Sequence, residues 1–316
     1  MQVYEDLDAA RPIGKSAVAL GFFDGLHLGH QAVIRKAAAW KEKGLLPEVF
    51  TFTIQHAAPQ KKAAAGRLLT ERHKWGLLGE WGIQMVLSPA FTAFQAMEPE
   101  EFVRRVLVEK LDAGAVCCGD DFRFGCRAAG DVGLLREICT GYGIQVDVAP
   151  EVTVEGERVS STAIRALLQQ GEAERANRML GRAFGYDFEV VHGKRLGRTI
   201  DSPTINQRLP EDFLCPRHGV YASVTQVGGT FYPSVTNIGL RPTVENTRAV
   251  NSETYICGFS GDLYGKHIPV RLLRFLRPEM KFPSVEALRA RIQADAAASE
   301  PIARQYIQKI ILQKAD

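Results

Sequence analysis

The sequence predicts an α/β protein in two parts, an N-terminal doubly wound parallel sheet and a C-terminal antiparallel β-barrel with a terminal helix. The chain has 316 residues, enough for two domains of the usual size. Up to about residue 182, short apolar runs alternate with helical patterns, which is typical of a parallel sheet. Beyond Gly181, short alternating runs follow one another between Gly, Pro and Asn turns, as in an antiparallel barrel. We therefore expect one domain over residues 1–183 and a second over residues 184–316.

The first half is expected to alternate strands and helices. Its apolar runs predict strands over residues 16–20, 48–53, 84–88, 113–118 and 144–148. Helices are predicted over residues 30–43, which Gly44 ends, 100–110 after Pro99, 132–142 with Asp131 as the N-cap, and 163–170 before Gly171. This alternation is typical of a doubly wound sheet.

The second half is expected to be mainly strand. Its alternating runs predict strands over residues 188–192, 219–227, 230–234, 254–259 and 267–275. A final helix is predicted over about residues 284–312, with a break near Pro301.

The composition excludes several classes of protein. Hydrophobic residues make up 46% of the chain and charged residues 24%, which are ordinary values for a folded globular protein. No apolar run approaches the ~18–20 residues that cross a bilayer, and the acidic start lacks the features of a signal peptide. The six cysteines contain no CxxC pair, which favours free thiols in a reducing cytoplasm. A net charge of +3 without long basic runs argues against nucleic acid as a partner.

The segment at residues 21–30, GFFDGLHLGH, joins the first predicted strand to the first predicted helix. In an open α/β sheet, ligands bind at the carboxyl ends of strands, beside helix N-termini whose free N–H groups attract phosphate. Gly25 and Gly29 let the backbone approach a ligand closely, and His27 and His30 can donate hydrogen bonds to a nucleotide phosphate. The alternative, a tight turn with two incidental histidines, is disfavoured because three glycines and two histidines fall within ten residues.

A second polar cluster lies at residues 160–165, with the sequence SSTAIR. Its hydroxyls can cap the helix predicted from residue 163. Capping needs only one hydroxyl, whereas Ser161 and Thr162 followed by Arg165 are typical of a phosphate site with a charged clamp. From this cluster alone the two interpretations are equally good; together with the histidine motif, phosphate binding is favoured.

These motifs and the stretch CGDDFRFG at residues 118–125 resemble the adenylyltransferase module of prokaryotic bifunctional riboflavin kinase/FAD synthetases, which belongs to the Rossmann-like nucleotidylyltransferases. The resemblance implies that the phosphate of FMN attacks the α-phosphorus of ATP and expels pyrophosphate, with Mg²⁺ bound to the nucleotide. His27 and His30 would contact the transferring phosphoryl group, and Arg165 would hold the outer phosphates. The resemblance further implies contacts to ATP and its phosphates from Gly21, Phe22, Asp24, Gly25, Gly29, Ser161 and Thr162, and a flavin contact from Phe124.

The chain departs from this family after its second predicted strand. The family reads TFDPHP there, whereas residues 51–56 read TFTIQH, without the aspartate and with His56 displaced. Asp121 stands where relatives carry Asn or an acidic residue, and nucleotide contact and a structural turn explain it equally well. No role is therefore carried over to residues 53–56.

The second half contains a further signal at residues 193–206, GKRLGRTIDSPTIN. Gly193, Gly197 and the neighbouring basic residues suit a flap around ATP phosphates. Thr204 and Asn206 alternate, so on an extended strand both side chains point the same way and offer neutral oxygen ligands to Mg²⁺. From this segment alone, an ordinary Gly/Pro-rich hairpin is the preferred interpretation.

The stretches PTIN at residues 203–206, TNIGLRPT at 236–243, SET at 252–254 and GDLYG at 261–265 resemble the riboflavin kinase module of the same enzymes. The resemblance implies that Glu253 is the base for the riboflavin 5′-hydroxyl, which attacks the γ-phosphorus of ATP. Taken alone, Glu253 is better explained as a solvated charge just before the strand at 254–259. The resemblance also implies ATP contacts from Gly193, Gly197 and Asn237, a flavin contact from Arg241, and metal ligation by Thr204 and Asn206. Asp201 and Ser202 replace the family's Gly-Phe and add a negative charge beside the expected phosphate site.

The leading hypothesis is a bifunctional enzyme of flavin cofactor biosynthesis that converts riboflavin to FMN and FMN to FAD. Its partners would be ATP, riboflavin, FMN, FAD and pyrophosphate, with Mg²⁺ accompanying ATP. One alternative is a single-activity FMN adenylyltransferase whose C-terminal barrel only binds flavin, which Asp201 favours. The other is a non-catalytic flavin-sensing regulator, against which the intact His27, His30, Arg165 and Glu253 argue.

Overall fold

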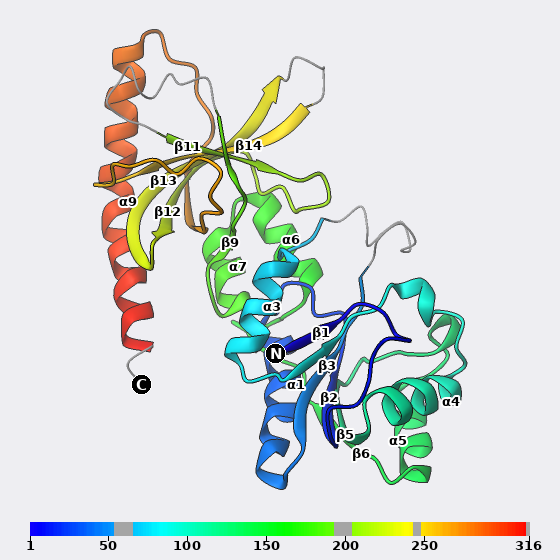
Figure 1. Ribbon diagram of the computed structural model, residues 1–316. Helices are drawn as coiled ribbons and strands as arrows, with labels where there is room; N and C mark the ends of the chain where they lie inside the picture. Colours follow the sequence, from blue (N-terminus) through cyan, green and yellow to red (C-terminus); the bar gives the residue numbers. More distant parts are fainter. Residues whose placement is uncertain (54–65, 193–203, 243–247, 314–316) are drawn as a thin grey trace. The chain divides into compact units, whose positions relative to one another are not determined.

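The computed structural model describes residues 1–53, 66–192, 204–242 and 248–313 (Figure 1). The chain divides into two compact units, Met1–Ala64 with Glu71–Ser160 and Ala65–Thr70 with Ser161–Asp316. They are called the N-terminal unit and the C-terminal unit below. The division into residues 1–183 and 184–316 expected from the sequence differs from these units in two segments, residues 65–70 and residues 161–183.

The N-terminal unit is built on a six-stranded sheet in the order β1-β4-β3-β2-β5-β6, and all its neighbouring strands are parallel. Its strands are β1 (Gln2–Tyr4), β2 (Ser16–Leu20), β3 (Leu46–Phe50), β4 (Met85–Leu87), β5 (Ala113–Gly119) and β6 (Gln145–Ala149). From β2 the chain moves outward through β3 and β4, and it then returns to the other side of β2 with β5. The carboxyl ends of β2 and β5 therefore form a topological switch point, where open α/β sheets bind ligands.

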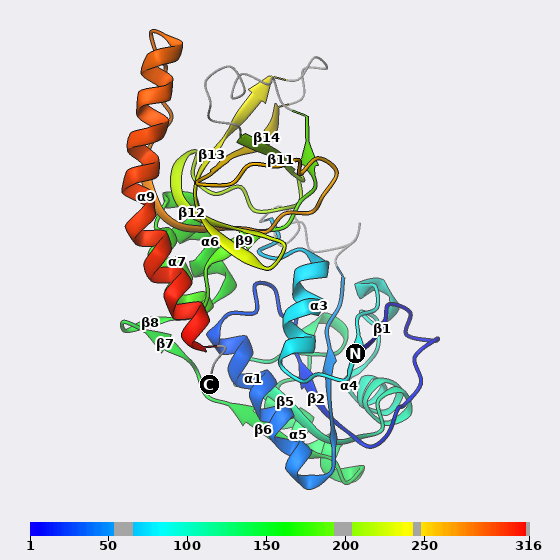
Figure 2. The same cartoon turned by 60° about the vertical axis from the view of Figure 1, so that its left-hand side comes forward.

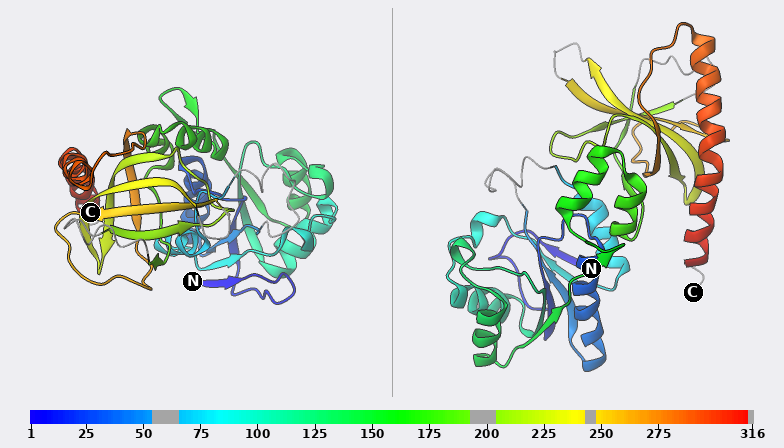
Figure 3. Two further views of the ribbon diagram at one scale, coloured as in Figure 1. Left: turned by 90° about the horizontal axis from the view of Figure 1, so that it is seen from above. Right: turned by 180° about the vertical axis from the view of Figure 1, so that it is seen from behind.

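Helices cover both faces of this sheet (Figures 2 and 3). They are α1 (Leu28–Ala39) with the 3₁₀ turn η1 (Trp40–Lys43), α3 (Glu71–Glu80), α4 (Pro99–Phe102), the π-helical η3 (Val103–Lys110) and α5 (Val132–Gly141). The shorter elements are η2 (Phe91–Ala93), η4 (Cys126–Ala128) and the hairpin of β7 (Thr153–Val154) and β8 (Glu157–Arg158). The predicted helix ends are confirmed: Gly44 has a φ of 81°, and the Asp131 carboxylate accepts from the Leu134 N–H at 2.9 Å.

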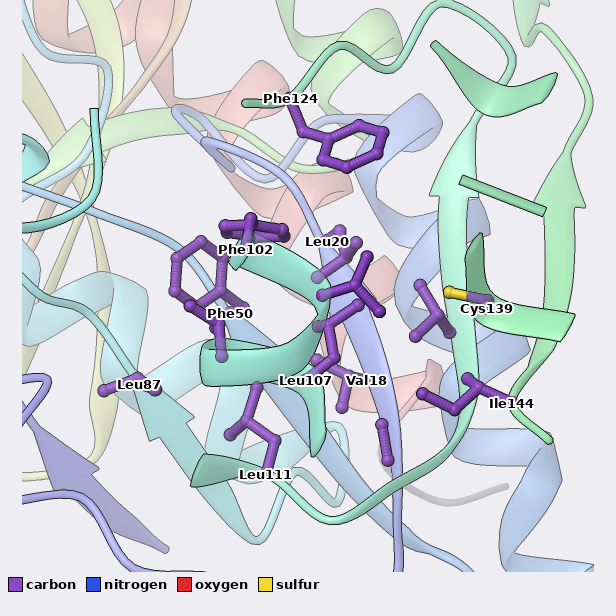
Figure 4. Packing of buried hydrophobic residues seen from close by; sticks show 14 of the residues in the cluster. Val18, Leu20, Phe50, Leu87, Phe102, Leu107, Leu111, Phe124, Cys139 and Ile144 are labelled. Carbon is purple, nitrogen blue, oxygen red and sulfur yellow. The ribbon is translucent and has the colours of Figure 1, made fainter. Parts of the chain in front are cut away.

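The core of the N-terminal unit lies between the sheet and the helices η3 and α5 (Figure 4). Side chains alternate along β2, so Val18 and Leu20 point into this core while Ala17 and Ala19 face the opposite side. Leu107 of η3 is fully buried in the same cluster. Truncating one such leucine costs ~2–5 kcal/mol. The packed sheet therefore gives the loops at its strand ends a rigid base.

The C-terminal unit contains a seven-stranded antiparallel sheet in the order β10-β11-β14-β13-β12-β15-β9. Its strands are β9 (Phe184–Tyr186), β10 (Val190–Val191), β11 (Thr204–Leu209), β12 (Gly219–Val227), β13 (Thr230–Pro242), β14 (Arg248–Ile256) and β15 (Val270–Arg277). Gly228 and Gly229 form the tight turn between β12 and β13, with φ of 56° and 85°. The sheet curls into a half-barrel, so the predicted fold class is confirmed for both parts of the chain (Figure 1).

Gln207 links the two edges of the half-barrel. Its buried amide Nε2 donates to the carbonyl oxygens of Phe188 at 2.6 Å and Ile268 at 2.8 Å. Phe188 lies between the edge strands β9 and β10, so these two bonds hold the curl of the sheet. On neighbouring strands, buried hydroxyls are joined at 2.8 and 2.9 Å in the row Ser223, Thr236 and Thr254. These three buried hydroxyl groups therefore satisfy one another by hydrogen bonding.

The terminal helix α9 (Val285–Gln313) runs unbroken through Pro301, so the predicted break is wrong. Proline removes one backbone N–H, which weakens a helix but does not end it where other contacts hold both sides. Here the Ser299 hydroxyl donates to the Ser234 carbonyl oxygen at 2.7 Å, and Ala303 is fully buried against the sheet. Packing on the sheet therefore outweighs the local signal.

The helices α6 (Ser161–Gln170) and α7 (Ala173–Leu180) belong to the C-terminal unit. On α7, the Asn177 amide donates to the Leu272 carbonyl oxygen at 2.9 Å and accepts from the Phe184 N–H at 2.7 Å. In the last turn of α6, the Leu168 carbonyl oxygen accepts from the Arg217 N–H at 2.9 Å. These bonds attach both helices to the antiparallel sheet and its loops.

Candidate active sites

The loop from β2 to α1 has a strained backbone at the switch point of the N-terminal sheet. Phe23 and Leu26 adopt left-handed conformations with φ of 52° and 44°, and Gly25 between them has a φ of 82°. A bulky residue in such a conformation costs ~1–3 kcal/mol and persists only where its surroundings hold it. Here both side chains are buried, and the Gln31 Nε2 donates to the Leu26 carbonyl oxygen at 3.0 Å. Strain held in this way is characteristic of functional sites.

His27 and His30 lie together at the N-terminus of α1. Their rings stack with centroids 3.5 Å apart and an angle of 18° between their planes. His27 is the N-cap residue, and its Nδ1 accepts the backbone N–H of His30 at 3.3 Å. With Nδ1 accepting, a neutral His27 ring carries its proton on Nε2 and offers that N–H as a donor. The predicted pair is therefore brought together at a helix N-terminus, where anions bind favourably.

Two glycines make this geometry possible. A Cβ at Gly29 would lie 3.2 Å from Cε1 and Nδ1 of His27, so any side chain there would push on the stacked ring. A Cβ at Gly21 would lie 2.9 Å from the ring of Phe23. Asp24, the remaining predicted contact of this loop, is buried with 7% of its surface exposed.

Lys74 of α3 is a member of this site that the sequence did not indicate. Its Nζ donates to the Phe22 carbonyl oxygen at 3.0 Å and to the Thr51 hydroxyl at 2.9 Å. The Thr51 hydroxyl in turn donates to the same carbonyl oxygen at 2.8 Å. Burial lowers the pKa of Lys74 to about 8, although the charges of Asp24 and Glu71 act in the opposite direction. The result is a cation held beside the loop that carries the histidine pair.

Phenylalanine rings form a connected cluster beside this loop. Phe22 stacks on Phe52 with centroids 4.9 Å apart, and Phe124 stacks on Phe122 at 5.9 Å. The other members, in contact through these rings, are Phe50, Phe91, Phe94 and Phe102. Phe124, predicted to contact flavin, lies in the buried core at 6% exposure, whereas Phe22, Phe52 and Phe122 are half-buried. Several of these phenylalanines follow the carboxyl ends of parallel strands, a signal that was available in the sequence.

Asp121 and its neighbours are engaged by Arg158. The Nη2 of Arg158 lies 2.8 Å from Oδ2 of Asp121 and 3.8 Å from Oδ1 of Asp120. The Nε of Arg158 lies 3.1 Å from Oε2 of Glu151. These are exposed ion pairs, which contribute little to stability. The ion pair with Arg158 supports the explanation of Asp121 as a residue of a structural turn.

The predicted phosphate cluster lies on the first turns of α6, in the C-terminal unit. The helix begins at Ser161, two residues before its predicted start at 163, so Ser161 and Thr162 are part of it. Thr162 is exposed, whereas Ser161 and Arg165 are half-buried. The Arg165 Nε donates to the Gly66 carbonyl oxygen at 2.9 Å, which fixes the direction of the guanidinium group. The hydroxyls and the guanidinium group thus share one end of a helix.

The second candidate site lies on one face of the antiparallel sheet. Asn206 on β11, Glu253 on β14 and Asn237 on β13 are direct cross-strand partners, so their side chains project from the same face. Glu253 lies inside β14, not before its start as predicted, because the strand extends back to Arg248. Asn206 is buried and Glu253 is half-buried. The register of three strands, not their sequence spacing, brings these groups together.

Two further side chains complete this face. The buried amide of Asn251 donates to Oδ1 of Asn206 at 3.1 Å and to Oε1 of Glu253 at 3.3 Å. No sequence motif had indicated a role for Asn251. The Asn237 Nδ2 donates to Oε1 of Glu279 at 3.1 Å. Its Oδ1 is buried and accepts no hydrogen bond from the described part of the chain, which suits a group that awaits a ligand.

Known proteins resemble the whole chain. A bifunctional riboflavin kinase/FMN adenylyltransferase of Pseudomonas fluorescens is 36% identical over 313 residues, covering 96% of this chain and 98% of that protein. A protein of the same name from Escherichia coli (strain K12) is 36% identical over 284 residues, covering 88% of this chain and 90% of its own. The FAD synthetase family model matches residues 11–163, and the riboflavin kinase model matches residues 180–303. The chain belongs to the bifunctional riboflavin kinase/FMN adenylyltransferase family.

The two candidate sites fall in the two matched regions of this riboflavin kinase/FMN adenylyltransferase family member. The histidine pair and Lys74 lie within the FAD synthetase match, and Asn206, Asn237 and Glu253 lie within the riboflavin kinase match. A solved structure described as a macrolide-efflux protein from Streptococcus pneumoniae is 27% identical, with a TM-score of 0.83 over 96% of this chain and 98% of that chain. Among the helices of the described residues, none has both the length and the apolar character needed to span a membrane.

The metal site expected in the riboflavin kinase region has oxygen ligands only. Within the described ranges, no group of three His, Cys, Asp or Glu side chains is placed to hold a metal ion. Thr204 and Asn206 on β11 instead offer a hydroxyl and an amide oxygen, which suit the Mg²⁺ that accompanies ATP, since this ion keeps several water and phosphate ligands. Several positions named in the sequence analysis lie outside the described residues: 54–56, Gly193, Gly197, Asp201 and Ser202. For Arg241, on β13, only the backbone is described.

Proposed function

We propose that the chain carries out two consecutive transfers, with riboflavin phosphorylated to FMN at the Glu253 site and FMN adenylylated to FAD at the His27–His30 site. The observation that supports this proposal best is that the stacked histidine pair lies within the FAD synthetase match and the cross-strand pair of Asn237 and Glu253 within the riboflavin kinase match. ATP is the donor in both reactions, and we propose that it acts as its Mg²⁺ complex.

In the adenylyl transfer, an oxygen of the FMN phosphate bonds to the α-phosphorus of ATP. The bond from that phosphorus to the bridging oxygen breaks, and pyrophosphate leaves with the electron pair. The FMN phosphate is already ionised near neutral pH, so no base is needed. The protein contributes position and charge stabilisation: the Nε2–H of His27 and the ring of His30 donate to oxygens of the transferring group at the N-terminus of α1.

Lys74 contributes to this site in two ways. Its bonds to the Phe22 carbonyl oxygen and the Thr51 hydroxyl hold the strained loop, and its positive charge favours an anionic nucleotide nearby. The partly exposed rings of Phe22, Phe52 and Phe122 provide an aromatic surface on which the flat isoalloxazine ring of FMN can stack. On α6, Ser161, Thr162 and Arg165 would bind the outer phosphates of ATP.

In the kinase reaction, the 5′-hydroxyl oxygen of riboflavin bonds to the γ-phosphorus of ATP while ADP leaves with the bridging electron pair. The hydroxyl proton passes to the carboxylate of Glu253. Asn206 and Thr204 hold the Mg²⁺ that ATP brings, and Asn237 offers its buried Oδ1 to the bound substrate. A carboxylate mounted inside β14 between two paired strands is rigid, which suits a base that must meet one hydroxyl.

Product analysis tests this proposal directly. The purified chain is incubated with riboflavin, ATP and Mg²⁺, and FMN and FAD are separated and measured over time. We expect FMN first and FAD after it. FAD formed from supplied FMN, with no FMN from riboflavin, would support an adenylyltransferase whose C-terminal unit only binds flavin. Neither product from either substrate would reject both catalytic roles.

The proposed partners are small molecules and the proposed compartment is the cytoplasm. All six cysteines fall within the described residues and are free thiols. Burial raises the pKa of Cys117, Cys118 and Cys139 to about 12, so these thiols stay protonated and unreactive near neutral pH. A reducing compartment suits such a chain.

A further inference from the structure

Asn251 occupies a position that joins the two predicted reactive groups of the kinase site. It lies two residues before Glu253 on β14, so both side chains project from the same face of the sheet. Only 5% of its surface is exposed. Its Nδ2 lies 3.1 Å from Oδ1 of Asn206 and 3.3 Å from Oε1 of Glu253. One NH₂ group therefore donates a hydrogen bond to the predicted metal ligand and a second one to the predicted base.

The polarity of this chain of bonds has a single solution. An ionised carboxylate can only accept, so Asn251 must present its NH₂ group, and not its oxygen, to Glu253. The same NH₂ group then meets Asn206, which must present its Oδ1. An amide oxygen has two lone pairs, so Oδ1 of Asn206 can accept this bond and still bind a cation. The reversed amide would offer its NH₂ group, which does not bind Mg²⁺.

We propose that Asn251 is a positioning residue for phosphoryl transfer, which orients the oxygen of Asn206 toward the metal of ATP and fixes the carboxylate of Glu253 for the riboflavin hydroxyl. This inference rests on the proposed kinase function. It goes beyond the sequence motifs, because Asn251 lies outside every stretch that carries the family resemblance. Partners that orient metal ligands typically change metal affinity or activity by ~10–100-fold when they are replaced.

The main variant is Asn251→Asp, which keeps the size of the side chain but replaces its two donated hydrogens with acceptors. We expect kcat for FMN formation to fall ~10–100-fold while the riboflavin KM changes little, and the Mg²⁺ concentration for half-maximal activity to rise several-fold. Asn251→Thr, which keeps one donor and suits a strand, should lie between Asn251→Asp and the unchanged chain.

The matched control is Ser252→Ala, on the same strand but on the opposite face. It removes the buried hydrogen bond between Ser252 and the Tyr186 hydroxyl, 2.7 Å long. It should lower the melting temperature without changing the Mg²⁺ dependence of the kinase. Melting temperature and FAD formation from supplied FMN are measured for every variant.

The outcomes separate the two claims. If the unchanged chain makes no FMN, the proposed kinase function fails. If it makes FMN but both Asn251 variants keep its kcat and Mg²⁺ dependence, the positioning role is wrong. A rate loss in both variants without a change in Mg²⁺ dependence, matching that of Ser252→Ala, would show a structural role only and would also overturn the proposal. A shifted Mg²⁺ dependence that is larger in Asn251→Asp than in Asn251→Thr supports it.

Discussion

The two candidate sites assemble their reactive groups in opposite ways. In the N-terminal unit, His27 and His30 come from one continuous loop and helix N-terminus at the edge of a parallel sheet. In the C-terminal unit, Asn206, Glu253 and Asn237 come from three different strands, and only the antiparallel register makes them neighbours. The histidine pair is local in sequence and follows a strained loop, whereas the group of Asn206, Glu253 and Asn237 is non-local and built from regular strands.

This difference sets how each site responds to change. The strained loop depends on small residues beneath it, such as Gly29, because a Cβ there meets the ring of His27. The strand-built site depends on register, because a shift of one residue would turn every reactive side chain to the opposite face. Substitutions near the histidine pair should therefore change the shape of the β2–α1 loop. Substitutions of the reactive side chains on β11, β13 and β14 should instead remove a chemical group and leave the sheet in place.

The largest expected effect concerns Glu253 in the strand-built site. Glu253→Gln keeps the size and the cross-strand register but removes the base, so FMN formation should fall ~10²–10⁴-fold. Riboflavin binding and FAD formation from supplied FMN should stay unchanged. Glu174→Gln, which removes an exposed ion pair with Arg274, is the matched control. A kinase rate unaffected by Glu253→Gln would leave in-line placement, without a base, as the source of catalysis.

The next prediction concerns the local site. His30→Ala should reduce FAD formation ~10²–10³-fold, the scale of losing one donor to a transition state. His30 is a cleaner target than His27, whose Nδ1 also caps α1, so that replacing His27 mixes loss of a donor with loss of a helix cap. FMN formation in the same reaction is the internal control. Equal loss of both products would mean that the sites are not independent.

A smaller effect is expected at Lys74. Lys74→Met should raise the KM for ATP in FAD formation ~10-fold, the scale of one hydrogen bond to a charged group. Because the pKa of Lys74 is lowered to about 8, its charge is present below that pH and lost above it. In the unchanged chain the KM for ATP should therefore rise as pH increases through about 8, and this rise should be absent in Lys74→Met. Lys36→Met, which removes the ion pair with Asp147, is the control and should still show the rise of the KM for ATP with pH.

The smallest effect concerns stability alone. Glu48 is fully buried on β3, and burial raises its pKa from 4.5 to about 8, with the charge of Asp112 acting the same way and a Ser16 hydrogen bond opposing. The folded state thus holds a proton that the unfolded chain releases, so stability falls as pH rises from about 4.5 to 8. Glu48→Gln should raise the free energy of unfolding by ~1–3 kcal/mol at pH 9, and by less at pH 6. Urea unfolding at both pH values measures this, and an equal gain at both would contradict it.

The same contrast explains what the sequence could predict. The strand before residue 21, the cap at Asp131 and the histidine pair are local features, and the structure has each of them. Lys74 was missed because its partners Phe22 and Thr51 lie 52 and 23 positions away on other segments. Asn251 was missed because its link to Asn206, 45 positions away, exists only through the pairing of two strands. The break at Pro301 was wrong because packing on the sheet outweighs a local signal.

The helix α6 has a consequence for how such a chain can evolve. It packs as part of the C-terminal unit, yet it carries Ser161 and Arg165, which we propose for the reaction of the N-terminal half, and the FAD synthetase match ends within it at residue 163. A gene split after α6 would remove from the riboflavin kinase half a helix that it packs against, and a split before α6 would remove from the FAD synthetase half the residues that we propose for phosphate binding. A cut on either side of α6 is therefore expected to weaken one of the two activities.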